Sequence, residues 1–216
     1  MLSASKEHEV ASEGPFVATR SRGLHRAFDI TCAATGLVIL SPLFCAIAVA
    51  IKFDDGGPIF YGQERVGKRF RRFRICKFRT MVPGADRHGL LTVGGDSRLT
   101  RMGRVLRRYK FDELPQLFNV LMGDMQLVGA RPEVELYVQM FRPEYAVILQ
   151  DRPGITDPAS LAYRHEEQLL STSRTEQQYL KEILPAKLRI SMDYHNRRNF
   201  LSDVGVLMKT VFGIST

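Results

Sequence analysis

The feature that most constrains the fold of this chain is an apolar segment near its N-terminus. No residue from Ile30 to Ile51 carries a charge, and these 22 residues just reach the length of about 20 that a membrane-spanning helix requires. A polar stretch precedes the segment and no small-residue cleavage site closes it, which argues against a cleavable signal peptide. We therefore expect a retained membrane anchor, which fits the length and basic flanks better than a buried core helix does.

The dipeptide Ser41-Pro42 interrupts this segment near its middle. Proline removes one helix hydrogen bond and bends the chain. At about 1.5 Å per residue each remaining arm reaches only about 14 to 20 Å, against a hydrocarbon core of about 30 Å. Ser41 could form the hydrogen bond that the break leaves open. These residues favour a re-entrant helix-break-helix, and a proline-kinked helix that crosses the membrane is the alternative.

Basic residues flank the segment on both sides, as is typical of cytoplasmic flanks. We expect a re-entrant helix over residues 20–52 with both ends in the cytoplasm, a loose tail over residues 1–19, and a cytoplasmic catalytic domain over residues 53–216. The flanking residues are Arg20, Arg22 and Arg26 before the segment and Lys52, Arg65, Lys68 and Arg69 after it.

The net charge of +8 indicates an anionic partner, such as nucleic acid, acidic lipid or a phosphorylated small molecule. The three cysteines, Cys32, Cys45 and Cys76, are too few and too scattered for a disulfide framework or a thiolate metal site. A reducing, cytoplasmic setting is the simplest inference.

The strongest charge run spans residues 65–79, with eight basic residues, no acidic ones and interleaved apolar residues. It is open to three functional interpretations: a membrane-facing patch, a polyphosphate-binding strand or a nucleic-acid surface. The structural alternative is a solvated strand whose alternate apolar residues turn inward. Its position shortly after the membrane segment favours contact with anionic lipid.

The rest of the pattern predicts an α+β chain that is mainly helical, with short strands and amphipathic surface helices. A helix with an apolar stripe should follow the capping pair Asp96-Ser97, and Gly123-Asp124 should end the next helix. Other expected elements are strands at 59–61 and 125–128, loops at 83–95 and 152–158, helices at 133–150 and 166–189, and an amphipathic helix at 200–212.

The pair Asp112-Glu113 stands at an expected helix start just after an arginine cluster. Pro115 is tolerated in a first turn, which makes Asp112 the expected N-cap. Capping alone is the commonest use of such an aspartate. A helix N-terminus also favours negative charge and attracts phosphate, so Asp112 should stay ionised beside a phosphate.

An ionised carboxylate beside a phosphate held by arginines is placed for nucleophilic attack at phosphorus. Arg107, near Asp112, and Arg131, between a glycine turn and a proline, would neutralise the phosphate charge. Alternatively, Arg131 pairs with Glu133 or Asp112. Glu113 is the expected metal ligand, and oxygen ligation by few carboxylates favours Mg²⁺.

A series of ordered motifs resembles the bacterial sugar transferase family, the monotopic polyprenyl-phosphate phosphoglycosyl transferases. The resemblance covers roughly residues 20–212. It rests on 57–61 (Gly-Pro-Ile-Phe-Tyr), 63–67 (Gln-Glu-Arg-Val-Gly), 77–81 (Lys-Phe-Arg-Thr-Met), 96–103 (Asp-Ser-Arg-Leu-Thr-Arg-Met-Gly), 112–116 (Asp-Glu-Leu-Pro-Gln), 123–125 (Gly-Asp-Met) and 131–133 (Arg-Pro-Glu).

The resemblance implies a re-entrant helix broken at Ser41-Pro42 and a catalytic domain on the cytoplasmic face of the bacterial inner membrane. It implies transfer of a sugar-1-phosphate from a UDP-sugar to polyprenyl (undecaprenyl) phosphate, an early step of surface glycan or exopolysaccharide assembly. Asp112 would be the covalent nucleophile of a ping-pong reaction that releases UMP, and Glu113 the Mg²⁺ ligand. Phosphate or nucleotide binding would fall to Arg107, Lys77, Arg79, Arg131 and Arg164.

The sequence departs from the family pattern at two turns. Ala130 stands where the family usually has proline, and Asp157 where a glycine is common. The altered loop around Asp157 bears on the alignment of Arg164 and on which sugar is accepted.

Membrane lipid, downstream glycosyltransferases and a second copy of the chain are the further partners that we consider. Two other functional classes compete with the enzyme. One is a membrane-tethered nucleic-acid-binding module that uses residues 65–79, which we disfavour because no nucleic-acid motif is present. The other is a structural scaffold of a glycan-assembly complex.

Overall fold

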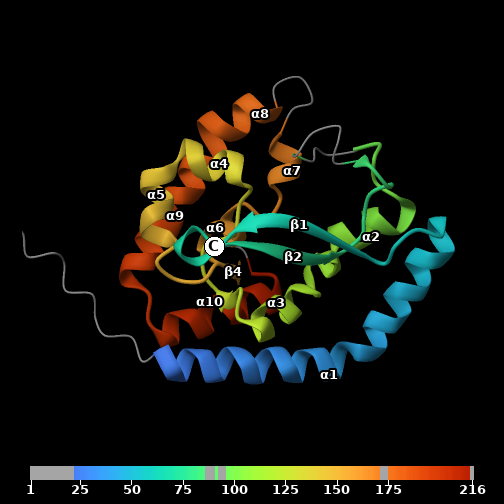
Figure 1. Ribbon diagram of the computed structural model, residues 1–216, viewed down its shortest axis with the longest axis horizontal. Coiled ribbons are helices and arrows are strands. Elements are labelled where there is room, and N and C mark those ends of the chain that lie inside the picture. Colours follow the sequence, from blue (N-terminus) through green and yellow to red (C-terminus); the bar gives the residue numbers. More distant parts are fainter. Residues whose placement is uncertain (1–21, 86–90, 92–95, 171–174, 215–216) are drawn as a thin grey trace, which may run out of the picture.

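The computed structural model describes residues 22–85, 91, 96–170 and 175–214. The tail predicted for residues 1–19 lies outside these, as do Arg20 and most of the loop predicted for 83–95. The described chain is mainly helical, with a few short strands (Figure 1). This confirms the mainly helical fold class.

Helix α1, Arg22–Asp55, contains the whole apolar segment and has Pro42 inside it. Figure 1 shows it along one side of the molecule, with a bend that turns its second half away from the first. The Ser41 Oγ donates a hydrogen bond to the Val38 carbonyl at 2.8 Å. That carbonyl is the one that Pro42 leaves without its regular helical donor, so the role predicted for Ser41 is confirmed.

By length and composition α1 could cross a membrane, and only 11% of its most apolar 18-residue window is buried in the protein. It is therefore not the core helix of a soluble protein. Its first half packs on α3, where Ala33 is fully buried, and Arg26 donates to the Val120 and Leu121 carbonyls at 2.7 and 3.0 Å.

The second half of α1 packs Ile47 and Ile51 against Phe78 and Leu106. At its end, Asp55 forms an ion pair with Arg79, and the Asp54 carboxylate accepts a hydrogen bond from the Met102 backbone N–H at 2.9 Å. Both ends of the apolar helix are thus joined to the rest of the protein.

Strands β1, Phe60–Val66, and β2, Arg72–Phe78, form an antiparallel hairpin whose register pairs Phe60 with Phe78 and Val66 with Arg72. The strand predicted at 59–61 is therefore present and longer. The 3-10 turn η1, Lys68–Phe70, joins the two strands. Much of the basic run lies on this hairpin.

Helix α2, Arg101–Arg108, starts at Thr100, whose Oγ1 accepts a hydrogen bond from the Gly103 N–H at 2.9 Å. The predicted capping pair Asp96-Ser97 is therefore wrong. Asp96 instead binds the Arg98 side chain, with which it forms an ion pair at 2.6 Å.

The predicted N-cap at Asp112 is also wrong. A left-handed Lys110 (φ 59°) leads into a separate 3-10 turn, η3, Phe111–Glu113. Helix α3, Gln116–Met122, follows and ends at Gly123 (φ 89°), as predicted. Asp112 lies inside this turn because the chain already coils before Pro115. Pro115 has no backbone N–H, so the turn and α3 do not form one continuous series of helical hydrogen bonds.

Strand β3, Gln126–Val128, pairs in parallel with β4, Gly154–Thr156. The first was predicted, whereas the second lies in a stretch predicted as loop. A methyl group on Gly154 would lie 2.1 Å from the Gly129 nitrogen, so glycine is required where these segments meet.

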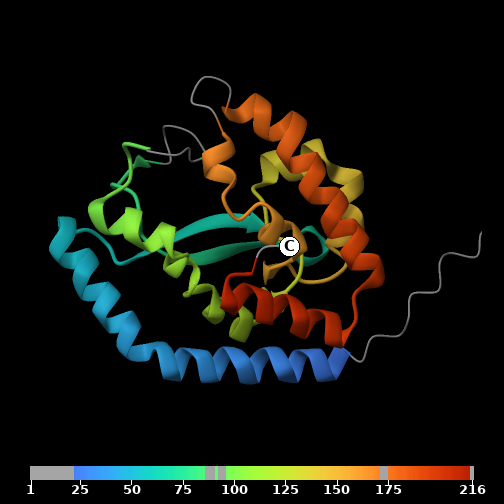
Figure 2. The same cartoon turned by 180° about the vertical axis from the view of Figure 1, so that it is seen from behind.

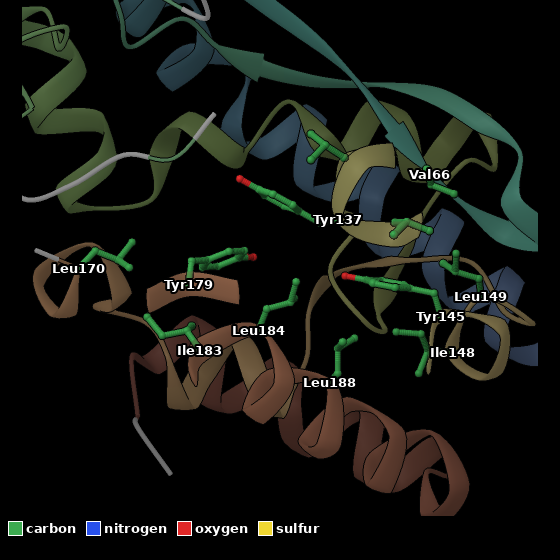
Figure 3. Close-up of a cluster of buried hydrophobic side chains, with 12 residues drawn as sticks. Val66, Tyr137, Tyr145, Ile148, Leu149, Leu170, Tyr179, Ile183, Leu184 and Leu188 are labelled. Atoms are coloured by element: carbon green, nitrogen blue, oxygen red, sulfur yellow. The ribbon is translucent and has the colours of Figure 1, made fainter. Parts of the chain in front are cut away.

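Several of the remaining helices pack around one hydrophobic cluster, in which Tyr137, Tyr145 and Leu184 are buried (Figure 3), whereas Leu161 and Val206 are buried in a second cluster. The helix predicted at 133–150 is divided at Phe141, just before Pro143. The amphipathic helix predicted at 200–212 has the predicted bounds. These elements are α4 (Glu135–Met140), α5 (Arg142–Ile148), α6 (Pro158–Ala162), α7 (Glu166–Leu169), α8 (Thr175–Gln178), the π-helical turn η4 (Tyr179–Ile183), α9 (Leu184–Arg197) and α10 (Phe200–Phe212).

Candidate active site

A cavity of about 420 Å³ contains the acid pair and most of the predicted phosphate-binding residues. The hairpin, α2 and the η3 turn contribute to its lining, together with residues near β3 and α9. The predicted site residues that line it are Lys77, Arg79, Arg107, Asp112, Glu113 and Arg131.

Glu113 is held by two cations that come from distant parts of the chain. The Arg131 Nη1 donates to Glu113 Oε2 at 3.0 Å and the Arg131 Nη2 contacts Oε1. The Lys77 Nζ lies 3.4 Å from Oε1. Burial opposes ionisation of Glu113, but Arg131 and Lys77 outweigh it and hold the pKa of this carboxyl well below its usual range. Arg131 thus pairs with Glu113, which is neither of the partners proposed from the sequence.

Asp112 is buried, and its Oδ1 has no hydrogen-bond partner among the described residues. Burial raises the pKa of the Asp112 carboxyl, although Lys77, Arg107 and Lys110 act in the opposite direction. Burial thus opposes the ionised Asp112 that the sequence analysis expected, whereas these three cations favour it. A buried, unpartnered carboxylate oxygen in a cavity is suited to contact a ligand.

Two of the predicted arginines have structural contacts within the cavity wall. The Arg107 Nε donates to Thr80 Oγ1 at 3.0 Å. Arg79 donates to the Pro58 and Met81 carbonyls at 2.6 and 3.0 Å, besides its ion pair with Asp55. Arg79 therefore anchors the end of α1 to β2.

Arg164 is not among the described residues that line this cavity. Its guanidinium lies beside Gly213, at the C-terminal end of α10. The structure therefore does not bring it together with the acid pair, and its phosphate-binding role stays a prediction.

The cavity also includes charged residues that the sequence reasoning did not select. Glu133 forms an ion pair with Arg65 and accepts a hydrogen bond from the Tyr179 hydroxyl at 2.9 Å, while Lys187 forms an ion pair with Glu166 at 2.7 Å. Arg65 stood in the basic run, but nothing in the sequence pattern connected residues 166–187 with the acid pair. Figure 3 shows the Tyr179 ring within the core cluster, so this side chain connects the core to the cavity.

The described residues contain no group of three or more histidine, cysteine, aspartate or glutamate side chains arranged for a metal ion. A site with fewer carboxylates still fits Mg²⁺, which usually binds one or two carboxylates together with substrate phosphates and water. Glu113, whose pKa is held low, is a carboxylate of this kind, and it adjoins the Asp112 Oδ1 that has no partner among the described residues.

An acid pair among cations in a cavity is suited to an anionic substrate, and Arg79 of the cavity lining is paired with Asp55 at the end of the long exposed apolar helix α1. Sequence comparison specifies the class further. The family model described as bacterial sugar transferase matches residues 20–216. The chain therefore belongs to the bacterial sugar transferase family, a family of transferases.

Three relatives illustrate this membership. The UDP-N-acetylgalactosamine-undecaprenyl-phosphate N-acetylgalactosaminephosphotransferase of Aeromonas hydrophila is 37% identical over 89% of this chain, but this match spans only 44% of the relative's own length. The exopolysaccharide production protein ExoY of Sinorhizobium fredii is 32% identical over 86% of this chain and 83% of its own length. The UDP-glucose:undecaprenyl-phosphate glucose-1-phosphate transferase of Caulobacter vibrioides is 34% identical, over 88% of this chain and 69% of its own length.

Proposed function

We propose that this chain transfers a sugar-1-phosphate from a UDP-sugar to undecaprenyl or a similar polyprenyl phosphate, giving polyprenyl-diphosphate-sugar and UMP. The observation that carries the proposal is the buried Asp112 Oδ1, which has no partner among the described residues and lies in a cavity rich in cations. The names of the relatives support the substrate classes. The product would enter exopolysaccharide or surface glycan assembly.

In the first step, an Asp112 carboxylate oxygen attacks the sugar-proximal phosphorus of the UDP-sugar. The bond from this phosphorus to the bridging oxygen breaks, and UMP leaves with the electron pair. The sugar phosphate is then attached to Asp112 as an acyl phosphate. In the second step, a phosphate oxygen of the polyprenyl phosphate attacks the same phosphorus and the Asp112 carboxylate leaves, which regenerates the enzyme.

The attack requires an ionised Asp112 carboxylate. Because burial raises the pKa of this carboxyl, the attack depends on surrounding cations that favour the ionised form. Lys77, Arg107 and Lys110 all favour the ionised form of Asp112. The same cations stabilise the negative charge that develops on the phosphoryl oxygens. Burial lowers the pKa of Lys77, but Glu113 opposes this and favours its charged form.

Glu113 would hold Mg²⁺ together with substrate phosphate oxygens. When bound, Mg²⁺ would neutralise phosphate charge and assist departure of UMP. Arg131 and Lys77 already contact the Glu113 oxygens. Glu113 must therefore bind the metal either in addition to these two side chains or in their place.

We further propose that α1 is re-entrant, with residues 20–52 in the membrane and the catalytic domain, residues 53–216, on the cytoplasmic face of the bacterial inner membrane. The bend of α1 and the bond from Ser41 to Val38 support this arrangement. The lipid acceptor would then reach the active site from the membrane in which α1 lies.

The test is a half-reaction without lipid acceptor. The full-length protein, with Mg²⁺ and a panel of UDP-sugars, should release one equivalent of UMP and gain the mass of a phosphosugar, mapped by peptide analysis to Asp112. Asp112→Ala should show neither result, whereas Asp193→Asn, at an exposed carboxylate, should behave like wild type. Turnover by Asp112→Ala without any adduct would refute the mechanism.

A further inference from the structure

The hairpin divides the basic run of residues 65–79 between two cavities. Arg65, Lys77 and Arg79 line the active-site cavity. The cations at the hairpin tip line a second cavity of about 570 Å³, which we call the tip cavity. It is lined by residues 67–69 and 71–73 of the hairpin, 122–124 at the end of α3, Arg26 and Arg152. No described residue lines both cavities.

The tip cavity has a large excess of positive charge, with six cations and a single carboxylate, Asp124, among its lining residues. Two of the cations meet at the end of α3. Arg26 donates to carbonyls of that helix, and the Arg152 Nε donates to the Gly123 carbonyl at 2.6 Å. Carbonyl oxygens at the C-terminal end of α3 accept hydrogen bonds from one side of each guanidinium. These neutral acceptors do not cancel the positive charges of Arg26 and Arg152.

Two further arginines at the hairpin tip have side chains without a partner among the residues that the structure describes. Arg72 is engaged by Glu64 and Glu135 at 3.2 and 2.5 Å. The side chains of Arg69 and Arg71, by contrast, are exposed and form no hydrogen bond or ion pair with any residue that the structure describes. They therefore remain available to an external anion.

The shape of the tip is fixed although its arginines are exposed. Arg69 and Phe70 both have positive φ, 53° and 61°, which side-chain-bearing residues rarely adopt. The Arg69 N–H donates to the Leu149 carbonyl at 2.8 Å, and the Phe70 ring lies under the Arg142 guanidinium at 4.6 Å. Because the backbone of the tip is already held in this conformation, the ordering cost of binding falls on the exposed arginine side chains and not on the backbone.

The surroundings of the tip cavity indicate the source of the anion. Met122, in the cavity wall, is 67% exposed, and Phe118, one turn earlier on α3, is 42% exposed. The Phe118 ring lies 6.2 Å from that of Phe44 on α1, and Figures 1 and 2 both show α3 next to α1. Arg26 precedes the uncharged segment of the same helix. The cations thus adjoin the apolar surface that we propose to contact the membrane.

We propose that the tip cavity binds the phosphate head group of an anionic phospholipid, at a site separate from that of the lipid acceptor. The exposed apolar side chains beside the cavity favour a lipid over a soluble phosphate compound. Arg69 and Arg71 would bind the head group, with Arg26 and Arg152 at the inner wall. This inference rests on the membrane attachment of α1 proposed above, but not on the chemistry at Asp112.

The experiment measures lipid retention by native mass spectrometry of the full-length protein in a neutral detergent. Short-chain phosphatidylglycerol, phosphatidylcholine and inorganic pyrophosphate are titrated separately. The variant is Arg69→Glu with Arg71→Glu. Its matched control, Lys181→Glu with Arg189→Glu, changes the net charge equally at exposed cations outside both cavities. The milder pair Arg69→Gln with Arg71→Gln serves if the charge reversal impairs folding.

Wild type and the Lys181/Arg189 control should bind phosphatidylglycerol more tightly than phosphatidylcholine. The Arg69/Arg71 variant should lose at least about tenfold in affinity for phosphatidylglycerol. Equal binding by the two variants, or no preference for phosphatidylglycerol in wild type, would overturn the proposal. Displacement of the lipid by pyrophosphate at similar concentration would assign the site to soluble phosphates instead. UMP release, measured in parallel, tests the proposed function separately, because lipid retention does not depend on catalysis.

Discussion

Arg131 contacts both carboxylate oxygens of Glu113, the residue next to buried Asp112, whose Oδ1 has no hydrogen-bond partner among the described residues. The two adjacent carboxyls consequently differ in pKa. Arg131 and Lys77 lower the pKa of Glu113 despite its burial, whereas burial raises that of Asp112. Environments that separate the pKa values of neighbouring acids are typical of paired carboxylates with different catalytic roles.

Arg131→Met should destabilise the protein because it leaves the partly buried Glu113 carboxylate with Lys77 as its main partner. We expect a loss of about 1–3 kcal/mol in the free energy of unfolding at neutral pH. The lowered pKa of Glu113 contributes stability above the unfolded pKa of this group, and this contribution is lost as the pH falls through the folded pKa. The deficit of the variant, measured by denaturant unfolding, should therefore shrink in acid. Arg131→Lys should lose less, and equal stability of Arg131→Met and wild type would contradict the prediction.

Asp112→Asn should have the opposite effect on stability. Because the folded pKa of Asp112 is raised, ionisation of this group costs stability as the pH rises above its unfolded pKa. The amide removes this cost, so we expect a gain of about 1–3 kcal/mol at neutral pH and a higher melting temperature, together with loss of UMP release. The gain should disappear in acid. Glu113→Gln, at a carboxyl of lowered pKa, should destabilise instead, and a destabilised Asp112→Asn would refute this account of the pair.

The sequence indicated the acid pair and most of its cations, but not how they pair. The motif around Asp112 and the basic run placed Lys77, Arg107 and Arg131 among the candidates, and all three line the cavity. The contacts of Glu113 cross 18 and 36 positions of the chain, so they depend on tertiary packing that no local pattern records. The same reason explains why Tyr179 and Lys187 were missed.

In the fold, strong local signals were reliable. Gly123 ended its helix, and the residues 200–212 formed the predicted helix because apolar periodicity and the Asn199 capping box agree. Strand β4 was missed because its three residues, between Pro153 and Pro158, are too few to show the alternation of a strand. Its pairing with β3 is also non-local, so the sequence around it does not indicate a strand. The helix predicted over 133–150 broke because Pro143 cannot continue the hydrogen-bond ladder of α4.

Pro42, which lies inside the continuous helix α1, should determine the topology of this helix. In a background without Cys32, Cys45 and Cys76, single cysteines placed ahead of Arg20 and after Lys52 should be labelled by an impermeant reagent from the same face. Ser41→Ala with Pro42→Ala restores the regular donor to the Val38 carbonyl and should straighten the helix, so that some molecules place these sites on opposite faces. Ser41→Ala alone keeps the proline and is the control. Opposite-face labelling in the parent protein would defeat the re-entrant assignment.

Gly103 should be required for full stability because α2 touches the backbone of Thr80, two residues beyond the end of β2. A methyl group at Gly103 would lie 1.9 Å from the Thr80 carbonyl oxygen, an atom that already accepts a hydrogen bond from the Thr100 N–H at 3.0 Å. Gly103→Ala must therefore push α2 away from Thr80, which also accepts from Arg107 in the cavity wall. We expect a loss of about 1–3 kcal/mol in stability, measured by denaturant unfolding, and reduced UMP release as Arg107 moves.

Gly205→Ala, within α10 and with nothing within 4 Å of the added methyl, should instead gain about 0.5–1 kcal/mol. Equal effects of the two substitutions would show that the contact with Thr80 does not constrain α2.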